Sequence, residues 1–440
     1  MVEITKMKAE KQKAEKEAFF CTTKELSRLG LEQIPTQFQS HKHLIYSSPA
    51  TLAFNSPGAE GFGVKRAGLA VPDSIMLIVA PGCCGRNTSL ISSMKEYNDR
   101  FYYLMMDETD IVTGRHLKKI PKAVEEICSV CPKKPSVVMI CITCVDALLG
   151  TDMERVCKKA EERVEIPVRP CYMYALTREG RKPPMVHVRQ SLYSLLEPGK
   201  KKGNVVNLLG FFSPLVDDCE IYDLLHSAGV KTIHEISRCK DYMEYQTMSE
   251  ANFNLVLHHE ARFAAEDFHN RLQIPFIELR RLYQIDKIEN QYHALGNALG
   301  VAFYDEKYKK QAEDALEKFR KKCPDASFAI GECLNADPFE LALALIRYGF
   351  SVPEIYGTIT VENFTYIRSL AKISPETKVF SNMEPTMIYY DPVKSDVNLA
   401  IGKDACYYHP DCPYVMWNGE EQPYGYAGVR RLFEQLLEVV

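Results

Sequence analysis

At 440 residues, the chain is too long for one compact core and predicts two or three domains. Its 46% hydrophobic and 25% charged residues are ordinary for a soluble globular protein, and a formal net charge of −4 offers no basic surface for nucleic acid. No apolar run is long enough to span a membrane, and the charged first residues lack a signal-peptide core. We therefore expect a cytoplasmic protein that binds neither nucleic acid nor membrane.

The first 47 residues are predicted to form an N-terminal arm. Residues 5–19 are rich in Lys, Glu and Ala and predict a charged, solvated helix. A loop of small residues follows at 48–59, just before the first expected strand. Its Pro and Gly residues allow the backbone to approach a ligand closely, so this loop is a candidate part of a binding site.

The rest of the chain predicts an α/β fold of three Rossmann-like domains, at 48–200, 201–325 and 326–440. Short apolar runs alternate with helical patterns, which is typical of parallel sheets, and the clearest linker is the break at 197–203. The expected strands are 75–80, 100–105, 137–142 and 168–172, then 204–210, 230–236, 254–257 and 274–277, then 327–330, 351–358, 378–380 and 387–390. Because ligands bind at the carboxyl ends of such strands, we expect the sheets to surround a central cleft.

Cysteines follow two of the expected strands in the first domain. Cys83 and Cys84 come after the strand at 75–80, and Cys144 ends the apolar run that begins at 137. The carboxyl ends of parallel strands meet at one edge of a sheet, where helix-terminal N–H groups favour a thiolate over a thiol. These cysteines are therefore expected to converge on one point above the sheet.

Three interpretations of the cysteines compete. The chain has 15 cysteines, and in a reducing cytosol any one of them is by default a packing residue. The pairs Cys128-x-x-Cys131 and Cys141-x-x-Cys144 suggest a four-thiolate zinc site, but the gap between them is short and the second pair ends a buried strand. The third interpretation is an iron–sulfur cluster held by strand-end thiolates together with ligands from another subunit.

The segments around Cys84 and Cys144 resemble the cluster-binding segments of the nitrogenase component 1 family. That family includes the molybdenum–iron protein subunits, the dark-operative protochlorophyllide reductase and other tetrapyrrole-reducing relatives. Its pattern has a strand ending in Gly/Pro-x-x-Cys-Gly, which Cys84-Gly85 matches. A later strand ends in Cys before a turn that carries Gly and Asp, which Cys144 and residues 149–152 match.

The resemblance extends over nearly the whole chain. Residues 252–257 and 273–276 are similar to the family's second domain, and Trp417 with residues 423–428 is similar to its C-terminal aromatic and glycine-rich loop. Because the chain has no Walker-type phosphate loop, any ATP hydrolysis must come from a partner.

The resemblance implies a [4Fe–4S] or larger cluster with Cys84 and Cys144 as metal ligands, in an anaerobic, electron-transferring oligomer. The family's first cluster ligand is expected near residues 55–58, where this chain has no cysteine, so Ser56, Cys83 or a partner residue would substitute. A homologous subunit or a second copy would share the cluster. The other implied partners are an ATP-hydrolysing iron–sulfur reductase and a small-molecule or tetrapyrrole-like substrate.

The second-domain strand at 254–257 ends at His258-His259-Glu260, which is the candidate site for a proton donor or an axial metal ligand. The alternative is a strand-end pair with one buried and one solvated histidine. In the molybdenum–iron α-subunit a cysteine near this position holds the large cofactor, and the histidine that holds its other end corresponds here to Val415 or Met416. Dinitrogen reduction is therefore not expected.

These observations favour a reductase subunit that receives electrons from the ATP-dependent partner and passes them to a substrate or cofactor in the cleft. A scaffold or maturation protein for a metallocofactor is the first alternative. A structural partner subunit without a cluster is the second.

Overall fold

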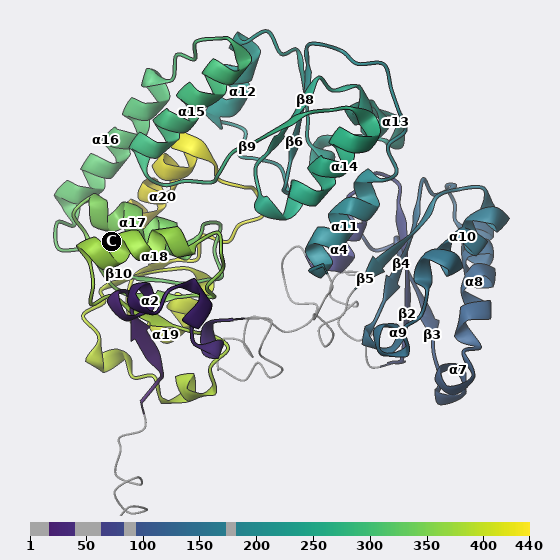
Figure 1. Ribbon diagram of the computed structural model, residues 1–440, viewed down its shortest axis with the longest axis horizontal. Helices are drawn as coiled ribbons and strands as arrows, with labels where there is room; N and C mark the ends of the chain where they lie inside the picture. Colours follow the sequence, from purple (N-terminus) through teal and green to yellow (C-terminus); the bar gives the residue numbers. More distant parts are fainter. Residues whose placement is uncertain (1–16, 40–62, 83–93, 173–181) are drawn as a thin grey trace, which may run out of the picture.

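The computed structural model of the chain describes residues 17–39, 63–82, 94–172 and 182–440 (Figure 1). Three sheets organise these residues, with helices packed around each of them, which confirms the α/β fold with parallel sheets. Most of the charged helix expected at 5–19 falls outside the described residues, as do Ser56, Cys83 and Cys84.

The first sheet is parallel throughout and has the strand order β3-β2-β4-β5. Strand β2 is buried along its whole length, so both faces of the sheet must be covered by helices. Alternate side chains of β2 pack against α8 and α10 on one face and against α4 and α11 on the other. The strands are β2 (Ile75–Ala80), β3 (Phe101–Met105), β4 (Val138–Ile142) and β5 (Val168–Tyr172), and the helices are α4 (Val64–Gly68), α7 (Glu108–Thr113), α8 (His116–Val130), α9 (Cys144–Leu149), α10 (Met153–Val164) and α11 (Pro184–Tyr193).

The second sheet is also parallel, with the order β7-β6-β8-β9. Its central strands carry Asn207 and Asn254, a buried pair joined by a hydrogen bond of 2.8 Å from Nδ2 of Asn207 to Oδ1 of Asn254. The strands are β6 (Val205–Leu209), β7 (Thr232–His234), β8 (Phe253–Val256) and β9 (Phe276–Glu278), and the helices are α12 (Glu220–Ser227), α13 (Tyr242–Gln246), α14 (Arg262–Leu272) and α15 (Ile285–Leu299).

The third sheet has the order β1-β12-β11-β10-β13-β14 and is parallel except at one edge. There β1, from the beginning of the chain, pairs antiparallel with β12. The strands are β1 (Phe20–Thr22), β10 (Ser327–Ile330), β11 (Ser351–Tyr356), β12 (Lys378–Phe380), β13 (Leu399–Ile401) and β14 (Tyr414–Val415). The helices are α2 (Thr23–Leu29), α16 (Glu306–Lys322), α17 (Pro338–Arg347), α18 (Phe364–Ile373), α19 (Lys403–Tyr408) and α20 (Gly425–Val439).

The expected strands agree with the structure at eleven of the twelve positions, within a few residues at their ends. The strand expected at 387–390 is wrong, because residues Pro385–Tyr389 form a 3₁₀ helix. Pro385 lies in its first turn, and the Glu384 side chain accepts a hydrogen bond from the backbone N–H of Thr386 at 3.4 Å. The local capping chemistry therefore overrides the apolar character of this segment.

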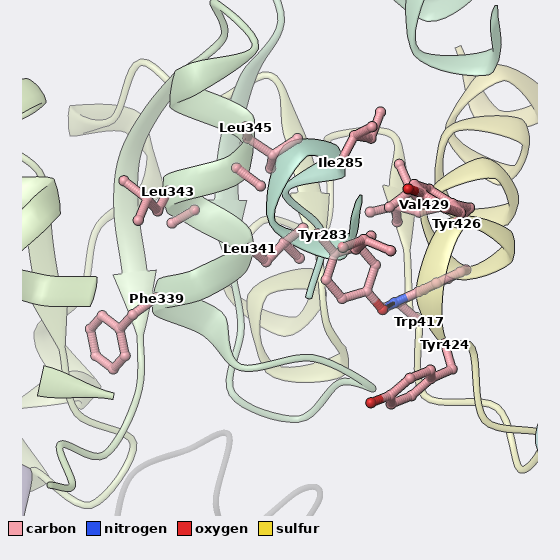
Figure 2. Packing of buried hydrophobic residues seen from close by; sticks show 14 of the residues in the cluster. Tyr283, Ile285, Phe339, Leu341, Leu343, Leu345, Trp417, Tyr424, Tyr426 and Val429 are labelled. Atoms are coloured by element: carbon pink, nitrogen blue, oxygen red, sulfur yellow. Dashed lines mark hydrogen bonds between the residues drawn. The ribbon is translucent and has the colours of Figure 1, made fainter. Parts of the chain in front are cut away.

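The second and third sheets share one continuous core, which Figure 2 shows from close by. Trp417 donates a hydrogen bond of 2.6 Å from its indole N–H to the hydroxyl of Tyr283, which donates in turn to the carbonyl of Asn335 at 2.8 Å. The polar atoms of these two buried rings, Trp417 and Tyr283, are therefore satisfied. This network fixes the segment before α20 against the third sheet.

Helix α20 begins at a buried carboxylate from another element. Glu220, at the start of α12, accepts hydrogen bonds from the backbone N–H groups of Tyr426 at 2.6 Å and Ala427 at 3.0 Å, and from the hydroxyl of Tyr292 at 2.7 Å. Burial raises the pKa of Glu220, and these three donors act in the opposite direction. Gly425 has a φ of 57°, and a Cβ there would overlap the Glu220 carboxylate, so this close approach requires glycine.

Candidate functional site

A cavity of about 480 Å³ lies where the three units meet. Its wall includes Arg189 from α11, the segments that follow β6, β8 and β9, and the loops at the carboxyl ends of β10 and β11. Gln422, from the C-terminal aromatic and glycine-rich segment, completes the wall. The cavity therefore occupies the position at which parallel α/β sheets place their ligands.

The end of β6 approaches the His258 segment with very little space between them. Gly210, directly after β6, has a φ of 139°, and a Cβ there would lie 2.7 Å from the backbone nitrogen of His258. Only glycine permits this approach. Phe211 follows, and its ring lies 5.7 Å from that of His258 in an edge-to-face arrangement.

His258 lines the cavity, half-buried, while its neighbour His259 is exposed and stacks on it at 4.5 Å. The Nδ1 atom of His258 accepts a hydrogen bond from the backbone N–H of Glu260 at 3.4 Å. Burial, together with the positive charges of Arg189 and Arg281, holds the pKa of His258 well below its usual range. The ring is therefore neutral and carries its proton on Nε2, since Nδ1 is already an acceptor.

Arg189 joins the first unit to the loop that carries His258. Its Nε and Nη2 atoms donate to the carbonyl of Gly210 at 3.0 and 2.7 Å. Its Nη1 atom donates to the backbone carbonyl of Met185 and to the Glu260 carboxylate, each at 2.8 Å. The guanidinium also lies 4.6 Å from the ring of Phe212. All of its nitrogens are occupied, so Arg189 acts as a fixed support for the cavity wall.

Arg281 lies on the same wall in a different environment. Its guanidinium stacks 4.3 Å above the Phe211 ring, and Nη2 donates to the side-chain oxygen of Gln422 at 2.6 Å. Its Nε atom is buried without a hydrogen-bond partner, and no carboxylate forms an ion pair with it within the described ranges. Burial lowers the pKa of Arg281, yet the group remains a cation.

The third unit supplies an acidic wall. Asp337 caps α17 by accepting from the backbone N–H groups of Phe339 at 2.9 Å and Glu340 at 3.1 Å, and burial raises its pKa to about 6. Burial also raises the pKa of Glu332, whose carboxylate accepts from the backbone N–H of Thr358 at 2.9 Å. The cavity thus has arginines on one side and carboxyl groups with a weakened tendency to ionise on the other.

The structure describes the strand-end cysteines only in part. Cys83, Cys84 and Ser56 are not among the described residues, and of Cys144 the structure describes only the backbone, which begins α9. Strands β2 and β4 are neighbours, with Val79 opposite Ile142, so their carboxyl ends lie side by side. The segments that carry Cys84 and Cys144 therefore leave adjacent strands of one sheet, while their assignment as ligands stays a prediction.

A buried histidine and aspartate anchor the helix that begins at Cys144. His116, from α8, is hydrogen-bonded through Nε2 to the Asp146 carboxylate at 2.9 Å and through Nδ1 to the carbonyl of Asp110 at 3.0 Å. Thr151 donates to the same Asp146 oxygen at 3.0 Å. These contacts fix the first turn of α9 against α8.

The other cysteines that were considered as ligands pack or bond locally. Cys141 and Cys171 are buried register partners on β4 and β5, and Cys131 is hydrogen-bonded to the hydroxyl of Tyr102 at 3.1 Å. The thiol of Cys412 donates to the carbonyl of Val397 at 3.6 Å. Within the part of the chain that is described, no group of three or more His, Cys, Asp or Glu side chains could hold a metal ion.

Sequence reasoning missed Arg189, Arg281 and the pair of His116 with Asp146. Arg189 and His116 lie within helices and show no local pattern. A signal did exist for Arg281, because the tandem Arg280-Arg281 begins three residues after the strand expected at 274–277, and ligand-binding groups gather at such strand ends in α/β folds. Among the described helices, none combines the length and apolar character needed to cross a membrane.

Comparison with known proteins gives a family match over most of the chain. The sequence profile of the family described as nitrogenase component 1 type oxidoreductase matches residues 60–440. A solved structure titled nitrogenase Cp1 at pH 6.5 has a TM-score of 0.69 and 18% identity, with 90% of this chain and 92% of that chain covered. At that identity, the likeness shows a shared fold.

Similar curated proteins carry the name nitrogenase iron-molybdenum cofactor biosynthesis protein NifE. The protein from Sinorhizobium fredii is 25% identical over 418 residues, which cover 89% of this chain and 82% of that protein. The protein from Mesorhizobium japonicum is 24% identical over the same length and coverage. The protein from Clostridium pasteurianum is 24% identical over 259 residues, which cover 57% of this chain and 55% of that protein.

Proposed function

Because the chain belongs to the nitrogenase component 1 type oxidoreductase family, we propose that it is a maturation protein that holds a metallocofactor precursor for transfer. The observation that carries this proposal is the cavity between the three units, lined by His258 and Arg281. The names of the similar proteins, which refer to cofactor biosynthesis, favour this function over that of an electron-passing reductase.

The residues at the positions where the family is expected to hold its cofactor support temporary rather than permanent binding. The resemblance places a cofactor-holding cysteine near position 258, where this chain has a neutral imidazole with its proton on Nε2. It places the second cofactor ligand near 415 or 416, where the chain has a buried valine and a half-exposed methionine. A hydrogen-bond donor and two apolar side chains would hold a metallocofactor less firmly than a thiolate and an imidazole.

A separate iron–sulfur cluster is proposed at the first sheet, where Cys84 and Cys144 would be its ligands. The adjacency of β2 and β4 supports this, since it brings the two carboxyl ends together. When bound, the cluster would supply electron storage. The chain's own part is to fix the start of α9, which it does through the buried contacts of Asp146 with His116 and Thr151.

We expect the anaerobically purified chain to contain iron and sulfide in near-stoichiometric amounts. His258→Ala should lower the retention of iron in the cavity about tenfold, because it removes the half-buried imidazole that follows β8 in the cavity wall. The measurement is metal analysis after gel filtration, with His259→Ala for comparison, because His259 borders the same cavity but is exposed.

The proposed maturation function is tested by transfer of the metallocofactor to an acceptor protein. The iron-loaded chain should activate an acceptor protein of the same family that lacks its cofactor, without turning over substrate on its own. Turnover of a small substrate with a reductase and ATP, and no transfer, would instead support the electron-passing reductase. A chain that contains no iron would leave only a structural partner subunit.

We further propose that a homologous subunit or a second copy covers the carboxyl edge of the first sheet. Leu148 and Leu149 of α9 are 66% and 49% exposed, and Met105 at the end of β3 is 63% exposed. Large apolar side chains gathered at one sheet edge are typical of an interface. The same edge carries the segments of Cys84 and Cys144, so a partner there could share the cluster.

The double substitution Leu148→Ser with Leu149→Ser should weaken this association at least about tenfold, because it removes apolar area from the interface. Sedimentation velocity over a range of concentrations measures the change. Val130→Ser is the matched control, since Val130 is 64% exposed but lies at the far end of α8. Equal association of all three proteins would contradict an interface at this edge.

A further inference from the structure

We infer that the cavity contains an anion subsite, in which Arg281 and His258 bind an oxyanion or carboxylate group of the ligand. This inference deepens the proposed function, because it concerns the same cavity. It rests on two groups that border one space: Arg281, which has no carboxylate partner within the described residues, and the Nε2 atom of His258, which has no acceptor there.

The first donor is Arg281. Its side chain is half-buried and its Nε atom is fully buried without a partner, and burial of a guanidinium is normally compensated by a carboxylate. Phe211 and Gln422 bind one face and one nitrogen of Arg281, but neither carries a negative charge. An anionic ligand in the cavity would supply the missing charge.

Two other arginines of the wall, Arg189 and Arg262, show what a compensated site looks like. Arg189 forms an ion pair with Glu260 at 2.8 Å, and Arg262 binds Glu278 at 2.5 and 3.0 Å. These two cations are neutralised before any ligand arrives. Arg281 therefore differs from them in being available for an incoming anion.

The second donor is the Nε2 atom of His258. Because Nδ1 accepts from the backbone N–H of Glu260, the ring presents its proton on Nε2, for which no acceptor is found among the described side chains and backbone. Both His258 and Arg281 border Phe211, at ring distances of 5.7 and 4.3 Å. The ligand group must therefore be rich in acceptors, as oxyanions and carboxylates are.

The acidic wall formed by Asp337 and Glu332 does not cancel the attraction of the cavity for an anion. Burial raises the pKa values of Asp337 and Glu332, which reduces their negative charge, and both carboxyl groups already accept hydrogen bonds from backbone N–H groups. The wall formed by Arg281 and His258 thus remains the side of the cavity that attracts an anion.

The test measures anion binding to the full-length chain purified without metal. Isothermal titration with sulfate, inorganic phosphate and malonate, at ionic strength held constant with chloride, should give saturable one-site binding. Malonate binding more tightly than sulfate and phosphate would assign the subsite to a carboxylate ligand, and the reverse order to an oxyanion.

Arg281→Met keeps an apolar side chain on Phe211 and removes the charge, and it should weaken binding at least about tenfold. Arg281→Lys keeps the charge but not the planar fork, and it should give an intermediate loss. Arg368→Met is the matched control, because the Arg368 guanidinium also lies over a phenylalanine ring, that of Phe364 at 5.0 Å, but outside the cavity wall, and this variant should bind as the unchanged chain does.

Circular dichroism shows whether each variant is folded. If Arg281→Met does not fold, the binding measured for Arg281→Lys tests the anion subsite. Binding that is absent in the unchanged chain, or equal in the Arg281 and Arg368 variants, would overturn the anion subsite. Anion binding by a chain that never acquires iron would instead refute the proposed function and leave the subsite standing.

Discussion

Cys144→Ala is expected to remove most of the visible iron–sulfur absorbance of the anaerobically purified protein, and Cys84→Ala is expected to do the same. Each substitution would take away a thiolate from a cluster that normally needs four ligands, of which this chain offers two. Residues 83–93 and the side chain of Cys144 are not described, so the prediction rests on the resemblance and on the adjacency of β2 and β4. Absorbance near 400 nm and electron paramagnetic resonance measure the loss, as expected for such clusters.

Cys128→Ala is the matched control for these substitutions. Cys128 is a half-buried thiol near the end of α8, and burial raises its pKa, so it is a poor candidate for a thiolate ligand. We expect the control to keep the full spectrum. Unchanged spectra in the variants of Cys84 and Cys144 would remove both residues from the cluster.

Glu220→Ala is expected to lower the free energy of unfolding by at least about 3 kcal/mol, because it leaves two backbone N–H groups and one tyrosine hydroxyl buried without an acceptor. The three donors are those of Tyr426, Ala427 and Tyr292. Urea denaturation, followed by circular dichroism, measures the change. Gly425→Ala should be similarly damaging, since its Cβ would overlap the same carboxylate.

The matched control for this prediction lies in the same helix. Glu434 of α20 is exposed and is paired with Arg430 at 3.3 Å, and Glu434→Ala should change the free energy of unfolding by less than about 1 kcal/mol. A comparable loss in both variants would mean that α20 is generally sensitive to substitution and that its buried cap has no special role.

The fold could be predicted from the sequence wherever a strand is a buried apolar run bounded by turn signals. Strand β2 ends at Pro81 in the sequence as in the structure. The short strands β13 and β14 could not be predicted, because runs of three and two residues are too short to show the alternation of apolar and polar residues that marks a strand. Strand β1 could not be predicted either, because its partner β12 is remote in the chain and only tertiary contact defines it.

The candidate site could be predicted in its position but not in its chemistry. The rule that ligands gather at carboxyl strand ends places His258 at the cavity, where it lies. Its tautomer depends on the backbone of Glu260, and Arg189 differs from Arg281 because the Glu260 carboxylate reaches Arg189 while Arg281 contacts the amide of Gln422. Such pairings arise from tertiary packing and leave no trace in sequence spacing.

The pairing of β1 with β12 has a consequence for how the chain is made. A ribosome releases Phe20 long before Phe380, its register partner in the third sheet. The first and second sheets, whose strands all lie between residues 75 and 278, can close in the meantime. The opening strand must wait for nearly the whole chain, so the third sheet is finished last, and a nascent protein stalled before residue 378 leaves its own N-terminal strand without a place to bind.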